Sequence, residues 1–334
     1  MTLSLCPICA TPIPAEMYTD NVTLRMRKTC PTHGAYDTLC ENDATFWEMC
    51  QQPFASEYNT QVYNDQGLVE VTDRCQLKCK HCYHMPDNKG TDVSAHIILA
   101  KAGILPTSNI CLIGAEPTLR DDLPEIIRSV RASGKRCSFY TNAIRLAEPT
   151  YADKIKASGV DYVSVSVHNV NYNGARVFDK AVAGLRNLHI RSIAIGQISF
   201  TVETDDEACE AYQKIAELWQ AGVRPLDFCV RFPADIGWHR APKQEWFVSD
   251  LWKCLRTYAA TRNWPVQIVP NSRNNPYHVR VMIAGQIPVQ LIKWPTIENI
   301  DLSFMNQGPW AMFDGISTHS FALAAILRDH HHAH

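Results

Sequence analysis

The chain has 334 residues, of which 46% are hydrophobic and 20% are charged, a balance typical of a globular protein with a substantial core. Its 32 Lys and Arg against 34 Asp and Glu give a formal net charge of -2, and no basic run favours nonspecific nucleic-acid binding. The sequence has no apolar run of about 18 residues, as a spanning helix needs, and its start lacks the basic and apolar regions of a signal peptide. We therefore expect a cytoplasmic enzyme of roughly one to three domains.

Cysteines are the most informative residue type in this chain. There are 13, an odd number, and most of those in the first quarter of the sequence fall into short clusters. Clustered cysteines in a chain without secretion signals indicate metal or redox sites rather than a disulfide framework.

Residues 1–55 contain two short patterns of metal-binding residues. These are Cys6-Pro7-Ile8-Cys9 and Cys30-Pro31-Thr32-His33, and an alternating stretch at 22–26 between them predicts a small hairpin. Three thiolates and an imidazole suit a tetrahedral metal, and a piece of this size needs a metal to stay folded. We expect one zinc or iron ion held by Cys6, Cys9, Cys30 and His33, with Cys40 as the alternative fourth ligand. The competing interpretation is that these residues are unconnected parts of a loop-rich arm.

The second cysteine cluster opens a core that we place at residues 56–264. A strand predicted at 68–71 is followed by Cys75, Cys79 and Cys82 in a C-x3-C-x2-C spacing. Most [4Fe–4S] clusters have four Cys ligands, so three thiolates on one loop leave one iron open to bind a small molecule. Three buried thiols without a metal, or a zinc site, are the competing interpretations.

Further along the core, strand and helix patterns alternate about six times between residues 66 and 262, which predicts a parallel sheet covered by helices. Apolar strands are expected near 109–113, 139–141, 163–167, 193–202 and 226–232. Between them lie amphipathic helices, such as the one with Leu123, Ile126, Ile127 and Val130 on one face, for which Asp121 and Asp122 are predicted as N-caps. Polar residues follow several strands directly, where an α/β barrel places its chemistry.

These motifs resemble, in order, those of the radical S-adenosylmethionine (SAM) superfamily, over roughly residues 66–235. The cluster loop has an aromatic-type residue, His81, before the third Cys, and Gly114-Ala115-Glu116-Pro117 resembles the family's Gly-Gly-Glu-Pro turn. Thr141-Asn142-Ala143 resembles its Thr-Asn-Gly, and Ser166 ends the strand whose Ser meets the SAM carboxylate. The resemblance implies a partial (β/α)6 TIM-like barrel, with Gly114, Ala115 and Glu116 at the methionine amino group.

The resemblance also implies the chemistry. Cys75, Cys79 and Cys82 would hold a [4Fe–4S] cluster that binds SAM and reductively cleaves it to a 5′-deoxyadenosyl radical, which abstracts hydrogen from an unactivated C–H bond of a small-molecule substrate. Asn142, Ser166, Ser199 and Arg231 are the candidates for SAM or substrate contacts, and a structural ion pair is the alternative for Arg231. A reducing partner of the flavodoxin or ferredoxin type is implied.

Three alternative functions stay open. One is cleavage of another S–C bond of SAM with transfer of a 3-amino-3-carboxypropyl group. The second is a non-catalytic iron–sulfur sensor or scaffold, favoured only by Ala115 and Ala143 in place of glycines. The third is nucleic-acid binding through residues 1–55, where Arg25, Arg27 and Lys28 are too few to make a basic face.

The two ends of the chain refine this picture. The N-terminal knuckles ahead of such a barrel resemble the subgroup of methylpterin methyltransferases and tetraether lipid synthases, but the isolated Cys209, Cys229 and Cys254 do not resemble ligands of auxiliary clusters. We expect residues 265–334 to form a capping extension that closes the open side of the barrel, with Trp294 and Trp310 in its core or near the substrate. The His-rich ending at 330–334 is expected to be a disordered tail.

Overall fold

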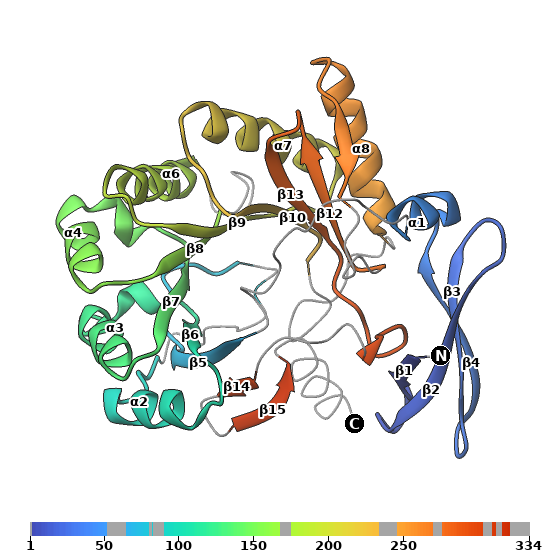
Figure 1. The fold of residues 1–334 in the computed structure, drawn as a ribbon, viewed down its shortest axis with the longest axis horizontal. Helices are drawn as coiled ribbons and strands as arrows, with labels where there is room; N and C mark the ends of the chain where they lie inside the picture. Colours follow the sequence, from blue (N-terminus) through green and yellow to red (C-terminus); the bar gives the residue numbers. More distant parts are fainter. Residues whose placement is uncertain are drawn as a thin grey trace.

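The computed structural model describes residues 2–51, 65–79, 82, 90–167, 175–233, 246–269, 276–302, 309–311 and 316–320. Within these residues the strands form two separate sheets, one of four strands and one of eleven. The small sheet lies beside the large one, and the large sheet curves into an arc with helices on its outer side (Figure 1). The predicted fold class, a partial α/β barrel behind a small N-terminal module, is confirmed.

The N-terminal sheet is an antiparallel meander in sequence order. Its strands are β1 (Thr2–Leu5), β2 (Pro12–Thr19), β3 (Leu24–Cys30) and β4 (Gly34–Glu41), and the short helix α1 (Ala44–Gln51) follows. In β3, Leu24, Met26, Lys28 and Cys30 are buried and the residues between them are not, which is the period-two pattern of a half-buried strand. The hairpin expected around residues 22–26 is therefore present as β2 and β3.

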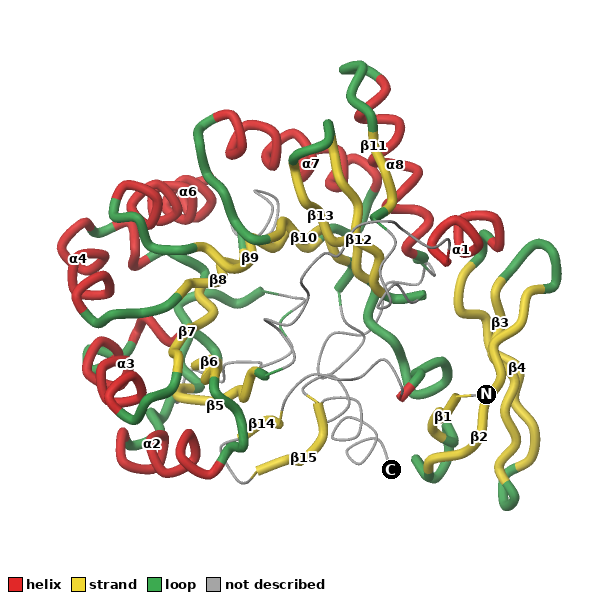
Figure 2. Tube along the Cα trace, in the orientation of Figure 1, coloured by secondary structure: helices red, strands yellow, loops and turns green. Residues whose placement is uncertain are grey.

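The barrel is built from six consecutive parallel strands, each paired with the next along the chain. They are β5 (Gln66–Thr72), β6 (Asn109–Gly114), β7 (Arg136–Thr141), β8 (Tyr162–Ser166), β9 (Ile195–Thr201) and β10 (Asp227–Arg231). The helices that cover them are α2 (Ala95–Ile104), α3 (Leu123–Ala132), α4 (Pro149–Ala157), α6 (Ala175–Ile190), α7 (Asp205–Gln220) and α8 (Val248–Ala260). Figure 2 shows these helices on the convex side of the arc. Parallel strands bring their carboxyl ends to one edge, so the loops that follow them meet there.

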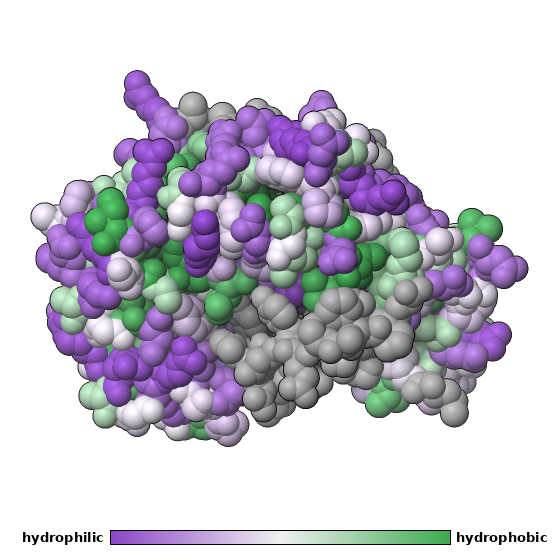
Figure 3. All heavy atoms as spheres, turned by 45° about the horizontal axis from the view of Figure 1, so that its top comes forward, coloured by the Kyte–Doolittle hydropathy of each residue, from purple (hydrophilic) through white to green (hydrophobic). Residues whose placement is uncertain are grey.

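The two faces of this sheet differ in chemistry. Toward the helices, alternate residues such as Ile110, Leu112 and Val163 are fully buried in one apolar core. The intervening residues are mostly polar, for example Asn109, Ser164, Ser199 and Asp227. Because neighbouring residues of a strand point to opposite faces, the concave side of the arc is lined by hydrogen-bonding groups. On the face drawn in Figure 3, hydrophilic side chains cover much of the described surface.

The C-terminal residues extend the same sheet at both of its edges. Strands β11 (Val266–Ile268), β12 (His278–Ile283) and β13 (Ile287–Ile292) form an antiparallel set in which β13 pairs in parallel with β10. At the other edge, β14 (Pro309–Ala311) pairs in parallel with β5 and leads to β15 (Ile316–Ser320). The segment expected to cap the barrel thus contributes strands to the barrel sheet itself.

Helix α3 shows both a confirmed and a wrong prediction. Leu123, Ile126, Ile127 and Val130 are all buried, as the spacing predicts. Asp122 occupies the N-cap position but makes no side-chain capping bond, because its carboxylate accepts two hydrogen bonds from Arg120 at 2.9 and 2.7 Å. Asp121 pairs with Arg145 at 2.6 Å, so neither aspartate caps the helix.

Among the described helices, none has the length and apolar character required to cross a bilayer.

Candidate functional site

The loop with the three cysteines begins directly beyond β5, at the carboxyl edge of the sheet. The Cys75 sulfur accepts a hydrogen bond from the Leu77 amide at 3.3 Å, and the Cys82 amide donates to the Cys79 carbonyl at 3.0 Å. Burial, with the nearby Glu116 carboxylate and the thiols of Cys79 and Cys82, raises the pKa of Cys75 to about 12. A buried thiolate is costly, and a positively charged metal group offsets that cost because it stabilises the sulfur anions that it coordinates. The three side chains therefore fit a cluster of positively charged irons. His81 lies outside the described residues.

The turn after β6 is held against the start of this loop. The Ala115 amide donates to the Thr72 carbonyl and the Glu116 amide to the Arg74 carbonyl, both at 2.9 Å. Gly114 has φ of 130°, and a Cβ there would lie 2.3 Å from the Thr72 carbonyl oxygen, so only glycine fits. Ala115 is absent from the described non-glycine residues with positive φ, which explains why this turn accepts a methyl group where the family has glycine.

The Glu116 side chain is 1% exposed and joins two turns. One carboxylate oxygen accepts bonds from the Thr118 amide at 3.1 Å, the Thr118 hydroxyl at 2.5 Å and the Thr141 hydroxyl at 2.6 Å, and the other accepts from the Asn142 amide at 2.7 Å. Burial raises the pKa of Glu116, and these donors oppose the shift. The structure thus gives this carboxylate a bridging role within the protein that the sequence did not reveal.

Asn142 carries this connection on to the cysteine loop. Its side-chain oxygen accepts from the Gln76 amide nitrogen at 3.2 Å, and its own side-chain nitrogen lies 4.0 Å from the Cys75 sulfur. The next residue, Ala143, has φ of 60° and is fully buried. Gly184 of α6 leaves the room for it, because a Cβ at Gly184 would lie 2.2 Å from the Ala143 carbonyl oxygen.

The other predicted contact residues lie on the next strands. Ser166 and Ser199 are register partners on β8 and β9, and Ser166 is half-buried. Ser199 is 2% exposed, and its hydroxyl donates to Gln197 at 3.1 Å. Arg231 ends β10 half-buried, and its Nε lies 3.4 Å from the Thr201 hydroxyl. No ion pair of Arg231 occurs within the described part of the chain, so the ion-pair interpretation has no support there.

Sequence reasoning missed a polar network on the concave face. Arg280 of β12 donates to both carboxylate oxygens of the buried Asp227 of β10, and Gln290 of β13 donates to the same carboxylate at 2.9 Å. Gln197 of β9 continues the network to Gln290 at 3.2 Å. The alternation of Asp227, Cys229 and Arg231 with apolar residues indicates that Asp227 lies on the concave face. Arg280 and Gln290 come from strands whose position in the sheet no local sequence pattern predicts.

The N-terminal residues form a compact candidate metal centre. The ligand atoms of Cys6, Cys9, Cys30 and His33 all lie within 4.8 Å of one another. The His33 Nδ1 is 3.5 Å from the sulfurs of Cys6 and Cys30, and the sulfurs of Cys9 and Cys30 are 4.0 Å apart. Tetrahedral zinc with the usual bond lengths requires edges of about 3.8 Å between two sulfurs and about 3.6 Å between sulfur and nitrogen. The four residues fit such an ion.

Two further observations support this ligand set. Burial would raise the pKa of Cys6, but the amides of Cys9 and Ile8 and the neighbouring thiols lower it to about 6. Cys40, the alternative ligand, belongs to a different buried cluster and accepts a hydrogen bond from the Tyr277 hydroxyl at 3.8 Å. His33 rather than Cys40 therefore completes the group.

The metal module packs against the barrel through buried polar contacts. The Lys28 ammonium, which donates to the Leu5 carbonyl within the module at 2.7 Å, also donates to the Ile297 carbonyl outside it at 3.3 Å. Glu41 at the end of β4 accepts from the hydroxyl of Ser249 at 2.6 Å and from its amide, in the first turn of α8, at 3.1 Å. These contacts hold the module against α8 and the segment that follows β13.

Comparison with known proteins agrees with this geometry. Residues 69–215 match the radical SAM superfamily, and residues 1–42 match the HMPTM N-terminal zinc ribbon domain. The 7,8-dihydro-6-hydroxymethylpterin dimethyltransferase of Methanocaldococcus jannaschii is 30% identical over 198 residues, which cover 51% of this chain and 39% of that protein. The Fe-coproporphyrin III synthase of Methanosarcina barkeri is 32% identical over 143 residues, covering 40% of this chain and 35% of that protein.

A third relative, a probable GTP 3′,8-cyclase of Metallosphaera sedula, is 29% identical over 183 residues, covering 51% of this chain and 56% of that protein. The matched segments thus span well under two thirds of the length of these relatives. Their names give different reactions, those of a methyltransferase, a synthase and a cyclase. The family implies a [4Fe–4S] cluster and SAM as cofactors, and the cysteine group implies a metal ion in the N-terminal module. Residues 69–215 are therefore a radical SAM domain and residues 1–42 a zinc ribbon, and together with the enzyme relatives these matches support a radical SAM enzyme.

Proposed function

We propose that this enzyme reductively cleaves SAM and modifies a small molecule at an unactivated C–H bond. Cys75, Cys79 and Cys82 would hold the cluster, because their loop starts at the carboxyl edge of the sheet and the thiols of Cys79 and Cys82 lie near enough to Cys75 to raise its pKa. When bound, the cluster and SAM supply one electron and a 5′-deoxyadenosyl group, which leaves as a radical that takes a hydrogen atom from the substrate. Residues 1–55, 56–264 and 265–334 would act as metal module, catalytic core and cap.

The observation that carries the proposal is the link between the turn of Ala115 and Glu116 and the loop of Cys75. Two backbone hydrogen bonds of 2.9 Å join the turn to Thr72 and Arg74, and Asn142 reaches toward the Cys75 sulfur. A small molecule chelated at the cluster would therefore lie between fixed backbone groups. The Glu116 carboxylate would orient the turn through its bonds to Thr118, Thr141 and Asn142. Fixed placement of this kind decides which bond of a bound sulfonium faces the electron source.

The other predicted contact residues would bind and orient SAM or the substrate. Ser166 and Asn142 offer hydrogen bonds at the ends of β8 and β7, and the Arg231 guanidinium suits a carboxylate or phosphate. The network of Gln197, Gln290, Asp227 and Arg280 is largely buried and its members bond to one another, so it would hold β9, β10, β12 and β13 together rather than contact the substrate. We propose a flavodoxin- or ferredoxin-type protein as the reducing partner.

The test is anaerobic reconstitution followed by incubation with SAM and dithionite. We expect about four iron and four sulfide per chain at the barrel site and one further N-terminal metal, with 5′-deoxyadenosine as product. Methylthioadenosine as the product would replace this proposal with aminocarboxypropyl transfer. If the triple Cys→Ala variant at positions 75, 79 and 82 keeps the iron–sulfur absorbance, the cluster assignment is wrong.

A further inference from the structure

The two ends of the cysteine loop are held side by side. Thr72 and Asp92 form an isolated antiparallel bridge, the Val93 amide donates to the Val71 carbonyl at 3.1 Å, and the Asp73 amide donates to the Thr91 carbonyl at 3.3 Å. The loop therefore leaves β5 and returns to it at the same place. This pairing of residues 71–73 with 91–93 is the junction of the loop. Contacts that fix the junction also fix the backbone just before Cys75.

An ion pair closes the junction one residue before Cys75. The Arg74 guanidinium donates to both carboxylate oxygens of Asp92, at 2.9 and 2.6 Å, and Asp92 also accepts from the Thr72 hydroxyl at 2.7 Å. Gly90 lies against the Arg74 side chain, because a Cβ at position 90 would be 2.0 Å from the Arg74 Cγ. The two charged groups are 38% and 35% exposed, and half-exposed pairs contribute little to overall stability. Their defined bidentate geometry is the more significant feature.

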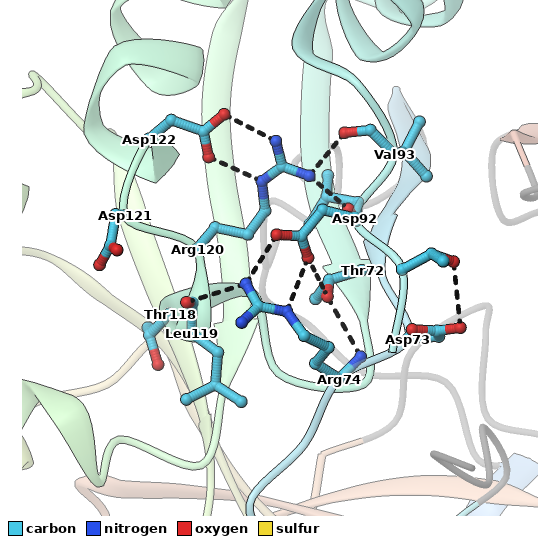
Figure 4. A network of polar contacts seen from close by, with 12 residues as sticks. Thr72, Asp73, Arg74, Asp92, Val93, Thr118, Leu119, Arg120, Asp121 and Asp122 are labelled. Atoms are coloured by element: carbon cyan, nitrogen blue, oxygen red, sulfur yellow. Dashed lines mark hydrogen bonds and ion pairs between the residues drawn. The ribbon is translucent and has the colours of Figure 1, made fainter. Parts of the chain in front are cut away.

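The same junction is tied to the turn that follows β6. Arg74 also donates to the Leu119 carbonyl at 3.1 Å, and Arg120 donates to the carbonyls of Val71 and Val93 at 2.7 and 2.6 Å. Arg120 is 3% exposed and is oriented by its bidentate contact with Asp122. Figure 4 shows the Arg74 guanidinium between Asp92 and Leu119, and the Arg120 guanidinium between Asp122 and Val93. Two guanidinium groups thus connect both ends of the cysteine loop with the Glu116 turn.

We infer that Arg74, Asp92 and Arg120 are positioning residues that set the place of Cys75 relative to the Ala115–Glu116 turn, and so the place of the cluster relative to SAM. This inference rests on the proposed function. Arg74 is bonded to Cys75 by one peptide and to the turn by its own carbonyl, which accepts from the Glu116 amide. A shift of the guanidinium would therefore move both the cysteine loop and the Ala115–Glu116 turn. Displacements of about 1 Å at a reacting centre can cost roughly a hundredfold in rate.

The experiment compares the reconstituted full-length enzyme with its Asp92→Asn, Arg74→Gln and Asp92→Glu variants. Asp153→Asn is the matched control, because Asp153 pairs with Arg191 at 2.7 Å on the helical side and is 64% exposed. Three properties are measured: the rate of iron loss to a chelator, the electron paramagnetic resonance (EPR) spectrum of the reduced cluster with and without SAM, and KM and kcat for 5′-deoxyadenosine formation. Urea unfolding confirms that each variant is folded.

We expect Asp92→Asn and Arg74→Gln to load iron normally, since all three cysteines remain, and to lose it roughly tenfold faster, as with other residues that orient metal ligands. The spectral change on adding SAM should be altered and kcat should fall more than KM rises. Asp92→Glu should recover part of each loss, and Asp153→Asn should match the wild type. Iron loss, spectra and kcat at wild-type values in both Asp92→Asn and Arg74→Gln would overturn the inference. If the loaded wild type makes no 5′-deoxyadenosine, the proposed function fails. The comparison of iron loss still tests whether Arg74 and Asp92 position the cysteine loop.

Discussion

The carboxylate of Glu116 accepts a 2.7 Å hydrogen bond from the backbone amide of Asn142, which lies on a different strand end of the barrel. Three more donors, from Thr118 and Thr141, meet the other oxygen of the same carboxylate. A carboxylate that accepts all of these bonds holds the turn after β6 against the turn after β7. The Asn142 side chain then connects the second turn to the Cys75 sulfur.

Replacing Glu116 with Gln should destabilise the protein. The amide group of Gln brings a donor against at least one protein donor, and an unsatisfied buried group of this kind costs about 1–3 kcal/mol. Urea unfolding of the apoprotein measures the loss. Glu125→Gln on the surface of α3, where Glu125 is 62% exposed, is the control and should change the unfolding free energy little. Equal values for the two variants would contradict the bridging role.

Gly184→Ala should destabilise the barrel although alanine favours helices. The added Cβ would lie 2.2 Å from the Ala143 carbonyl oxygen, and overpacking of this kind costs about 1–3 kcal/mol. Gly103→Ala is the matched control, because that helical glycine has no neighbouring atom within 4 Å, and it should gain up to about 1 kcal/mol from helix propensity. Thermal or urea unfolding separates the two. Stabilisation by both substitutions would show that α6 does not pack tightly on the Asn142 turn.

Cys6→Ser should remove the N-terminal metal, whereas Cys40→Ser should not. Cys6 belongs to the group of four ligands, and Cys40 contacts Tyr277 instead. Metal analysis of the two purified proteins is the direct measurement. Loss of the ion should also lower the melting temperature, because small metal modules depend on their ion for folding. Metal loss in Cys40→Ser with retention in Cys6→Ser would reverse the ligand assignment.

The contact of Glu41 with α8 should make stability depend on pH. Burial raises the pKa of Glu41 to about 7, and Ser249 and Asn42 only partly oppose this shift. A carboxyl with a higher pKa in the folded state binds more protons there, so stability falls as the pH rises from about 4.5 to about 7, by up to about 3 kcal/mol. The unfolding free energy of Glu41→Gln should have a smaller slope over this range than that of the wild type. Parallel slopes would contradict the shift.

The order of strands and helices and the grouping of four N-terminal metal-binding side chains could be predicted from the sequence. These features are local: apolar spacing defines the helices of the barrel, and Cys6, Cys9, Cys30 and His33 sit on two knuckles whose spacing suits one ion. The resemblance to the family's Gly-Gly-Glu-Pro turn likewise placed Gly114 and Ala115 just after an apolar strand.

Only the tertiary structure decided the rest. The N-cap predicted for Asp122 is wrong because the Arg120 guanidinium lies close enough to bind it bidentately. The pairing of Arg74 with Asp92, of Glu116 with Asn142, and of Asp227 with Arg280 joins residues that are far apart in the chain. Such contacts depend on which strand ends the barrel brings together, and hydrophobic periodicity specifies the face of each strand but not its partner across the sheet.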